Sequence, residues 1–263
     1  MTNYTTIQLD INDKGVASLT LDRVEVHNAM NSQLIAEMQS ALQLIEDSDD
    51  IRVLVLSGMG KTFCAGGDLN WMKANITKAR NERVAESGEL ADMLAMLDNL
   101  SKPLIGRIQG SAFGGGIGMM SVCDIAIGVD NAKFGLTEVK LGLTPATISP
   151  YVVKRMGATH ARRNFLNARV FGAQEAQQMG LLTEVVSAES LDDVIQQEIN
   201  LLLKCAPSAI AMSKQLIRYV DIHNDEENRS YTTNMLADVW ETEEAKEGID
   251  AFLNKRKASW IRN

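Results

Sequence analysis

The sequence predicts an α/β fold followed by a helical C-terminal region. Three continuous apolar runs read as strands that are covered on both faces of a largely parallel sheet: Val53–Leu56, Leu104–Ile108 and Ile125–Ile127. Between the first two runs, apolar residues recur at helical spacing: Leu90, Met93, Leu94, Leu97 and Leu100. Strand, helix and strand in this order are typical of an α/β core. After about Ser149 the strand pattern nearly vanishes, which is the third observation.

The first part of the chain predicts a hairpin and a helix. Ile7–Ile11 and Val16–Leu21 flank a turn of asparagine, aspartate, lysine and glycine, as a hairpin requires. Asn31 or Ser32 can cap the helix that follows. Its buried face is predicted from residues at helical spacing: Leu34, Ile35, Met38, Ala41, Leu42 and Ile45.

The C-terminal region predicts helices. Leu191–Leu203 and Ala209–Val220 have helical periodicity, and one short apolar segment, Leu181–Val186, interrupts the pattern before them. No run of glycine, proline or serine separates this region from the core. We expect an α/β core over residues 1–190 and a helical region over residues 191–263.

Composition excludes several classes of function. The chain of 263 residues carries a formal net charge of −8, which opposes non-specific nucleic-acid binding. Its three cysteines and three histidines are scattered without metal-ligand spacing, so we expect reduced thiols and no metal. The start lacks the features of a signal peptide, and no apolar run could span a bilayer. We therefore expect a cytoplasmic protein without a membrane segment.

Two glycine clusters are candidates for binding an anion. Gly114–Gly118 enters a predicted helix, but its third glycine falls too early for a dinucleotide fingerprint. Cys64–Leu69 follows a predicted strand, and its Asp68 is suited to cap a short helix. Glycine lets a backbone N–H approach a ligand closely. Gly60-Lys61-Thr62 lacks the earlier glycine of a P-loop, because Val55 stands there.

Six groups of residues carry a family resemblance. In chain order they are Leu21-Asp22-Arg23 with Asn28-Ala29-Met30, Phe63 to Leu69, Lys102 to Ile105, Gly110 to Gly116, Cys123 to Ala126, and Phe252 with Lys255-Arg256. Together they resemble the crotonase, or enoyl-CoA hydratase/isomerase, superfamily. The bacterial enoyl-CoA and methylglutaconyl-CoA hydratases are the most similar members. The chain departs from the family at Val24, where a proline commonly follows the arginine.

The resemblance implies a fold, a substrate class and roles for residues. The fold would be a superhelix of repeated ββα units, and the C-terminal helices would mediate oligomerisation into a trimer or a dimer of trimers. The substrate would be an acyl-CoA thioester, so coenzyme A is part of the substrate and no separate cofactor is expected. The N–H groups of Gly67 and Gly115 would form an oxyanion hole. The other residues implied to contact the substrate or its coenzyme A are Ala65, Gly66, Asp68, Gly114, Phe252 and Lys255.

Glu138 is the predicted acid and base. Family hydratases commonly use two glutamates, and the position of the first is Gly118 here. The second position is Glu138, whose apolar neighbours predict burial and hence a raised pKa: Phe134, Leu136, Val139, Leu141 and Leu143. Met119 and Met120, beside the missing carboxylate, are expected in the core.

Several functions stay open at this stage. The resemblance favours an enoyl-CoA hydratase of fatty acid metabolism, and the segment Gly142–Val153 is similar to hydratases of branched, methylglutaconyl-CoA-like substrates. A single glutamate is typical of the family's double-bond isomerases. Hydrolysis with Ser111 as nucleophile lacks a histidine and an acid in any recognisable motif. A non-catalytic CoA- or RNA-binding protein would fit the missing carboxylate, but the acidic charge opposes RNA and the retained Glu138 opposes loss of catalysis.

Overall fold

The computed structural model describes residues 4–262, and two mixed β-sheets form the centre of this part. The larger sheet has the order β1-β2-β3-β5-β7-β10, in which β1 pairs antiparallel with β2 and each later pair is parallel. Its strands are β1 (Ile7–Ile11), β2 (Val16–Leu21), β3 (Val53–Gly58), β5 (Leu104–Ile108), β7 (Ile125–Val129) and β10 (Glu184–Val186).

Each strand of the smaller sheet follows a strand of the larger one or a helix. The order is β4-β6-β8-β9, parallel except between β8 and β9. These strands are β4 (Thr62–Cys64), β6 (Ser111–Phe113), β8 (Lys133–Gly135) and β9 (Val170–Gly172). Successive strand pairs β3–β4, β5–β6 and β7–β8 each lead into a helical segment, so the chain repeats a ββα unit. This is the fold that the resemblance implied.

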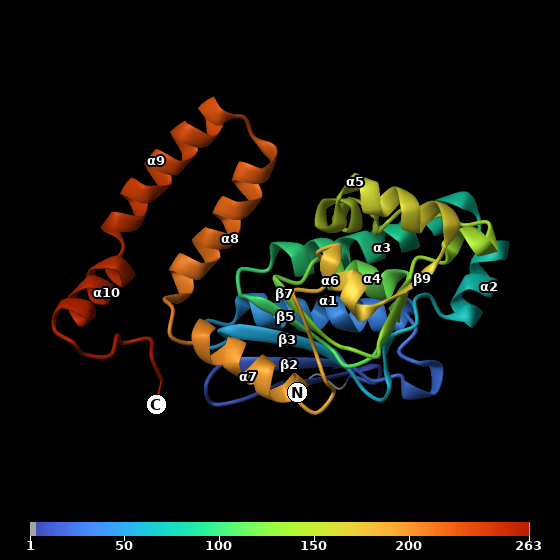
Figure 1. The fold of residues 1–263 in the computed structure, drawn as a ribbon, viewed down its shortest axis with the longest axis horizontal. Coiled ribbons are helices and arrows are strands. Elements are labelled where there is room, and N and C mark those ends of the chain that lie inside the picture. Colours follow the sequence, from blue (N-terminus) through green and yellow to red (C-terminus); the bar gives the residue numbers. More distant parts are fainter. Residues whose placement is uncertain (1–3, 263) are drawn as a thin grey trace.

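Helices cover the sheets and form the C-terminal region (Figure 1). They are α1 (Ser32–Asp47), α2 (Leu69–Thr77), α3 (Arg80–Asn99), α4 (Gly115–Ser121), α5 (Ser149–Asn167), α6 (Ala173–Gln178), α7 (Leu191–Leu202), α8 (Pro207–Ile222), α9 (Asp225–Glu241) and α10 (Glu243–Leu253). Two short 3-10 helices, η1 (Val24–Val26) and η2 (Glu138–Leu141), lie in loops.

The longer predicted elements are confirmed. The hairpin strands have the predicted bounds, and the Asn31 side chain caps α1 by accepting from the Leu34 N–H at 2.9 Å. The six predicted apolar residues of α1 are buried. Strand β9 was not predicted, because its three residues, Val170–Gly172, gain their order from antiparallel pairing with β8 rather than from an alternating pattern.

Helices α8, α9 and α10 stand away from the α/β core, and we call them the C-terminal arm (Figure 1). The buried guanidinium of Arg52 holds the two ends of the arm together. It donates to the Cys205 carbonyl, before α8, at 2.7 Å and to the Trp260 carbonyl, after α10, at 2.9 Å. Lys214 of α8 adds an ion pair to Asp124 of the core at 2.6 Å. Helix α7 instead packs on β5 and β7. The predicted division of the chain at residue 190 stays a prediction.

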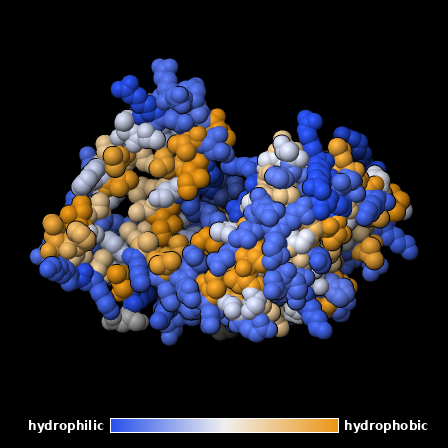
Figure 2. Space-filling view, viewed as in Figure 1, coloured by the Kyte–Doolittle hydropathy of each residue, from blue (hydrophilic) through white to orange (hydrophobic). Residues whose placement is uncertain are grey.

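The arm exposes many large apolar side chains. Figure 2 shows hydrophobic residues gathered over this part of the molecule. The arm residues concerned are Ile217, Val220, Ile222, Leu236, Trp240, Ile249, Phe252 and Leu253. Contiguous apolar surface of this kind is typical of an interaction site on a folded protein.

Candidate active site

The two glycine clusters meet at one edge of the smaller sheet. Gly66 and Gly67 follow β4, Gly114 and Gly115 follow β6, and the two strands are parallel neighbours. Gly66 and Gly114 both have positive φ, at 95° and 49°. A Cβ built on Gly114 would lie 3.8 Å from the Gly66 Cα, so the backbones approach closely. Glycine suits both features, because it adopts a positive φ without strain and has no side chain to keep the two backbones apart.

Two backbone N–H groups are available at this edge. The Met30 N–H donates to Gly66 O at 2.7 Å, and the Asp68 N–H donates to Met30 O at 2.8 Å. The Gly67 N–H between them points away from this pairing, as alternate residues of a strand do. Gly115 is the first residue of α4, where a helix offers no internal acceptor. Within residues 4–262, neither N–H donates a hydrogen bond, and both glycines are partly exposed.

Met30 links the two glycine loops and was not among the predicted site residues. Its backbone pairs with Gly67, and its side chain ends at Gly115. A Cβ built on Gly115 would lie 1.8 Å from the Met30 Cε, so residue 115 must lack a side chain while the methionine keeps this position. No sequence pattern indicates this contact, because the two residues are far apart along the chain.

Glu138 lies beside the same loops. It is the first residue of η2, and a Cβ built on Gly114 would lie 3.0 Å from the Glu138 Oε1. Among the described residues the Glu138 Oε2 is buried without a hydrogen-bond partner. Burial raises the pKa of Glu138, and a hydrogen bond from its own backbone N–H opposes this only in part. A carboxyl group with a raised pKa is suited to moving a proton near neutral pH.

The apolar neighbours of Glu138 do not all bury it, which corrects one expectation. Phe134 and Leu136 are fully buried, but Val139, Leu141 and Leu143 are 37%, 63% and 53% exposed. The reason is that η2 and the following turn at Gly142 carry these three residues outward. The burial of Glu138 therefore comes in part from the loop at Gly114, which lies beside its Oε1, and not from these three exposed residues.

The raised pKa of Glu138 predicts a pH-dependent effect of Glu138→Gln on stability. The folded state keeps the proton at pH values where the unfolded chain has lost it. The stabilising contribution of Glu138 is therefore complete below its unfolded pKa and is lost as the pH rises through the folded pKa. We expect the melting temperature of Glu138→Gln to exceed that of the wild type at about pH 7.5, with a smaller advantage at about pH 4. Melting scans of both proteins across this range check it; an advantage that stays constant with pH would contradict it.

Ala65 and Asp68 occupy fixed positions near the loops. The Ala65 N–H already donates to His27 O at 3.0 Å, which leaves its carbonyl as the backbone group for a ligand. Asp68 is confirmed as a helix cap, since its carboxylate accepts from the N–H groups of Asn70 at 2.8 Å and Trp71 at 3.2 Å. It also pairs with Arg23 at 3.0 Å. Although burial favours its neutral form, these hydrogen bonds lower the pKa of Asp68 below its usual range.

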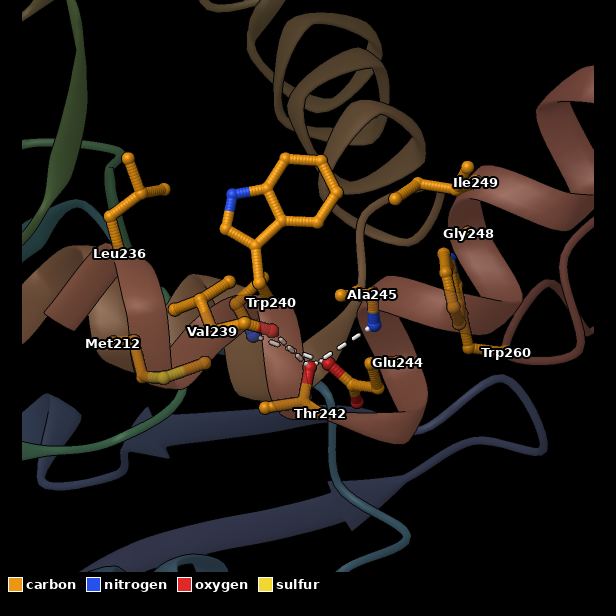
Figure 3. Close-up of a pocket in the computed structure, with 12 residues that line it drawn as sticks. Met212, Leu236, Val239, Trp240, Thr242, Glu244, Ala245, Gly248, Ile249 and Trp260 are labelled. Carbon is orange, nitrogen blue, oxygen red and sulfur yellow. Dashed lines mark hydrogen bonds between the residues drawn. The ribbon is translucent and has the colours of Figure 1, made fainter.

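Phe252 and Lys255 are not brought to the glycine loops within one chain. Phe252 lies near the end of α10 and is 83% exposed, and Lys255 follows this helix, also exposed. Figure 1 shows α10 at the far end of the arm from α4. The arm has a pocket of about 360 Å³ between α8, α9 and α10, lined by Leu236, Trp240 and Trp260 among others (Figure 3). None of the predicted site residues lines this pocket.

The position of the missing carboxylate is filled by hydrocarbon. Gly118 is buried in α4, and a Cβ built on it would lie 2.6 Å from the Ile148 Cγ2 and 3.7 Å from the Leu94 Cδ1. Met119 and Met120 are fully buried, so their predicted core role is confirmed.

Other candidate chemistries find little support in the described part of the chain. The Ser111 hydroxyl accepts a hydrogen bond from the Lys133 N–H at 3.0 Å, and no histidine of the described residues is hydrogen-bonded to it. Residues 4–262 contain no group of three His, Cys, Asp or Glu side chains placed to hold a metal ion. None of the helices in the same range is long and apolar enough to cross a membrane.

Comparison with known proteins decides the family. The model of the enoyl-CoA hydratase/isomerase family matches residues 12–263. The chain belongs to this family. It is 31% identical over 251 residues to the short-chain-enoyl-CoA hydratase of Clostridium acetobutylicum, covering 94% of this chain and 95% of that one. It is 33% identical over 248 residues to the enoyl-CoA hydratase ACTT6 of Alternaria alternata, covering 94% and 81%.

A solved structure of this family has nearly the same fold. An enoyl-CoA hydratase from Shewanella pealeana superposes with a TM-score of 0.94 at 37% sequence identity, and the match covers 97% of this chain and 96% of that one. The enoyl-CoA hydratase/isomerase fold, with its repeated ββα units and helical C-terminal region, is therefore confirmed.

Proposed function

We propose that the protein is an enoyl-CoA hydratase, a carbon–oxygen lyase that adds water across the 2,3 double bond of an enoyl-CoA. The observation that carries this proposal is the juxtaposition of two N–H groups without a partner among the described residues, of Gly67 and Gly115, with the half-buried Glu138, whose Oε2 is buried without a hydrogen-bond partner. Membership of the family supports the acyl-CoA substrate. The relatives named as hydratases support the reaction.

The proposed chemistry uses one carboxylate twice. Ionised Glu138 takes a proton from a water molecule as the water oxygen attacks C3, and the electrons of the double bond move towards the thioester oxygen. The N–H groups of Gly67 and Gly115 stabilise the resulting enolate oxygen. Removal of one donor of this kind typically lowers kcat by about two to three powers of ten. Protonated Glu138 then delivers the proton to C2. The product is a 3-hydroxyacyl-CoA.

An assay across a panel of enoyl-CoA thioesters tests this function. The panel includes straight-chain, branched and carboxylated substrates, and loss of the conjugated thioester absorbance is followed together with product analysis. We expect formation of a 3-hydroxyacyl-CoA from at least one member. Absence of hydroxylated product throughout the panel would contradict the proposal. A branched, methylglutaconyl-CoA-like substrate is the specific member we propose, on the resemblance of segment Gly142–Val153.

A single carboxylate also favours a second function, enoyl-CoA double-bond isomerisation. In this reaction Glu138 would remove a proton from C2 of a 3-enoyl-CoA and return it at C4, through the same enolate. The buried contact of Gly118 with Ile148 favours this alternative, because it leaves no room for a second acid at that point. Conversion of a 3-enoyl-CoA to the conjugated 2-enoyl-CoA, followed in the same panel, measures the isomerase activity directly.

We further propose that the protein is a homo-oligomer, a trimer or a dimer of trimers, assembled through the C-terminal arm. Its exposed apolar side chains support an interface of this kind. A neighbouring chain could then bring Phe252 and Lys255 to the coenzyme end of the substrate, which they do not reach within one chain.

Sedimentation checks the oligomer. We expect a species of three or six chains at micromolar concentration and weaker association for Leu236→Glu/Trp240→Glu, since a charge is costly to bury at an apolar interface. Leu166→Glu is the control, because Leu166 is a highly exposed leucine on α5, outside the arm. A wild type that sediments only as a 28.8 kDa monomer would contradict this assembly.

A further inference from the structure

The contact between Gly118 and Ile148 joins the two segments that carry the proposed catalytic atoms. Gly118 lies in α4, the helix that begins with Gly115. Ile148 lies directly before α5, in the segment that runs on from Glu138 and η2. A Cβ built on Gly118 would lie 2.6 Å from the Ile148 Cγ2 and 3.0 Å from the Ile148 Cβ. Carbon atoms normally approach to about 3.5–4.0 Å, so the isoleucine is seated against bare backbone.

Ile148 is held firmly in this position. It is 3% exposed, and its carbonyl accepts from the Val152 N–H at 3.1 Å in the first turn of α5. Its Cγ2 branches directly from Cβ, and β-branched side chains are stiff at χ1. The buried side chain of Leu94 lies near the same point, because a Cβ built on Gly118 would also lie 3.7 Å from the Leu94 Cδ1.

We propose that Ile148 is a positioning residue of the enoyl-CoA site, whose β-branched side chain packs on Gly118 and sets the spacing between α4 and the segment of Glu138. The inference rests on the proposed function and names a residue through which that site keeps its geometry. The Gly115 N–H and the Glu138 carboxyl group belong to different segments, and Ile148 is where those segments are packed together. The same contact keeps this side of α4 hydrocarbon, so proton transfer is left to Glu138.

Substitutions of similar volume separate positioning from bulk packing. Ile148→Leu keeps the side-chain volume but removes the branch that touches Gly118, whereas Ile148→Val keeps the branch and removes only the terminal methyl. We expect Ile148→Leu to lower kcat about tenfold or more with KM within about threefold, because a displacement of about 1 Å can cost a hundredfold. Ile148→Val should keep kcat within about threefold of the wild type, since its Gly118 contact is retained.

A reciprocal substitution tests the contact itself. Gly118→Ala places a Cβ against the Ile148 Cγ2, and we expect it to lower kcat in the wild-type background. In the Ile148→Leu background the same change should cost less, because the obstructing branch is gone. Additive effects on kcat, or a loss in Ile148→Val as large as in Ile148→Leu, would overturn the inference.

Proton exchange at C2 measures the positioning role of Ile148 separately from the proposed hydration. Exchange of the C2 protons of a saturated acyl-CoA in D₂O requires Glu138 and the enolate site but no addition of water to a double bond. A wild type that exchanges but does not hydrate would contradict the proposed function and still allow the Ile148 series to be measured. Ile148→Leu exchanging at the wild-type rate would overturn the positioning role while hydration by the wild type stood.

Discussion

Glu138→Gln is expected to lower kcat by about a hundredfold to ten-thousandfold, the range that a general acid or base contributes. Glutamine keeps the shape of the side chain and its hydrogen-bonding ability but cannot exchange the proton. The loss should be near the upper end of the range, because Gly118 offers no second carboxylate and the proposed mechanism assigns both transfers to Glu138. Steady-state kinetics with the best enoyl-CoA of the panel provide the measurement.

Substrate affinity should change little in Glu138→Gln, since in the proposed site binding rests on the backbone donors and the coenzyme contacts. An equilibrium Kd for a saturated acyl-CoA separates binding from turnover. Glu89→Gln is the control, because Glu89 is an exposed carboxylate on α3, and we expect it to be fully active. Retention of more than about a tenth of wild-type kcat in Glu138→Gln would rule out its role as the acid and base.

Gly115→Ala is expected to lower kcat by about a hundredfold, since the new Cβ must displace Met30 or the α4 backbone by an ångström or more. The Gly115 N–H remains, but the space that the thioester oxygen requires is reduced. Kinetics and acyl-CoA affinity of the purified variant give the measurement. Gly88→Ala is the matched control, because a Cβ on Gly88 in α3 would meet nothing within 4 Å.

The variant Gly115→Ala/Met30→Ala distinguishes two reasons for that loss. If the methyl group at residue 115 crowds the substrate oxygen, removal of the Met30 side chain leaves turnover low. Full recovery in the double variant would show that Gly115 serves only the packing of Met30, and the oxyanion role would then be wrong. Full activity of Gly115→Ala alone would lead to the same conclusion.

The sequence predicted the longer elements well because their burial follows a period along the chain. Helix α1 and the strands β1 and β2 appeared with nearly correct bounds. The strands of the smaller sheet have three residues each, too few to show an alternation, and only pairing with distant strands defines them. Strand β9 was missed for this reason.

The candidate site was predicted in part. The glycine clusters could be identified as candidates because glycine gives a ligand access to the backbone, but the roles of Gly67, Gly115 and Glu138 came from the family resemblance. The contacts of Met30 and Ile148 could not be predicted, since each residue lies against a glycine remote in sequence, Gly115 and Gly118 respectively. The burial of Glu138 was expected from Val139, Leu141 and Leu143, which are in fact exposed. The separation of Phe252 and Lys255 from the glycine loops could not be predicted either, because it depends on the direction in which the arm leaves the core.

Turnover of an enoyl-CoA by the wild-type protein in D₂O, with product analysis by mass spectrometry, tests the central claim most directly. Hydration through Glu138 predicts a 3-hydroxyacyl-CoA with one carbon-bound deuterium at C2 and an oxygen from the solvent. Glu138→Gln should give this product at most at about a hundredth of the wild-type rate. If the wild type yields only a shifted double bond, or if Glu138→Gln forms the hydroxylated product as fast as the wild type, the account is contradicted.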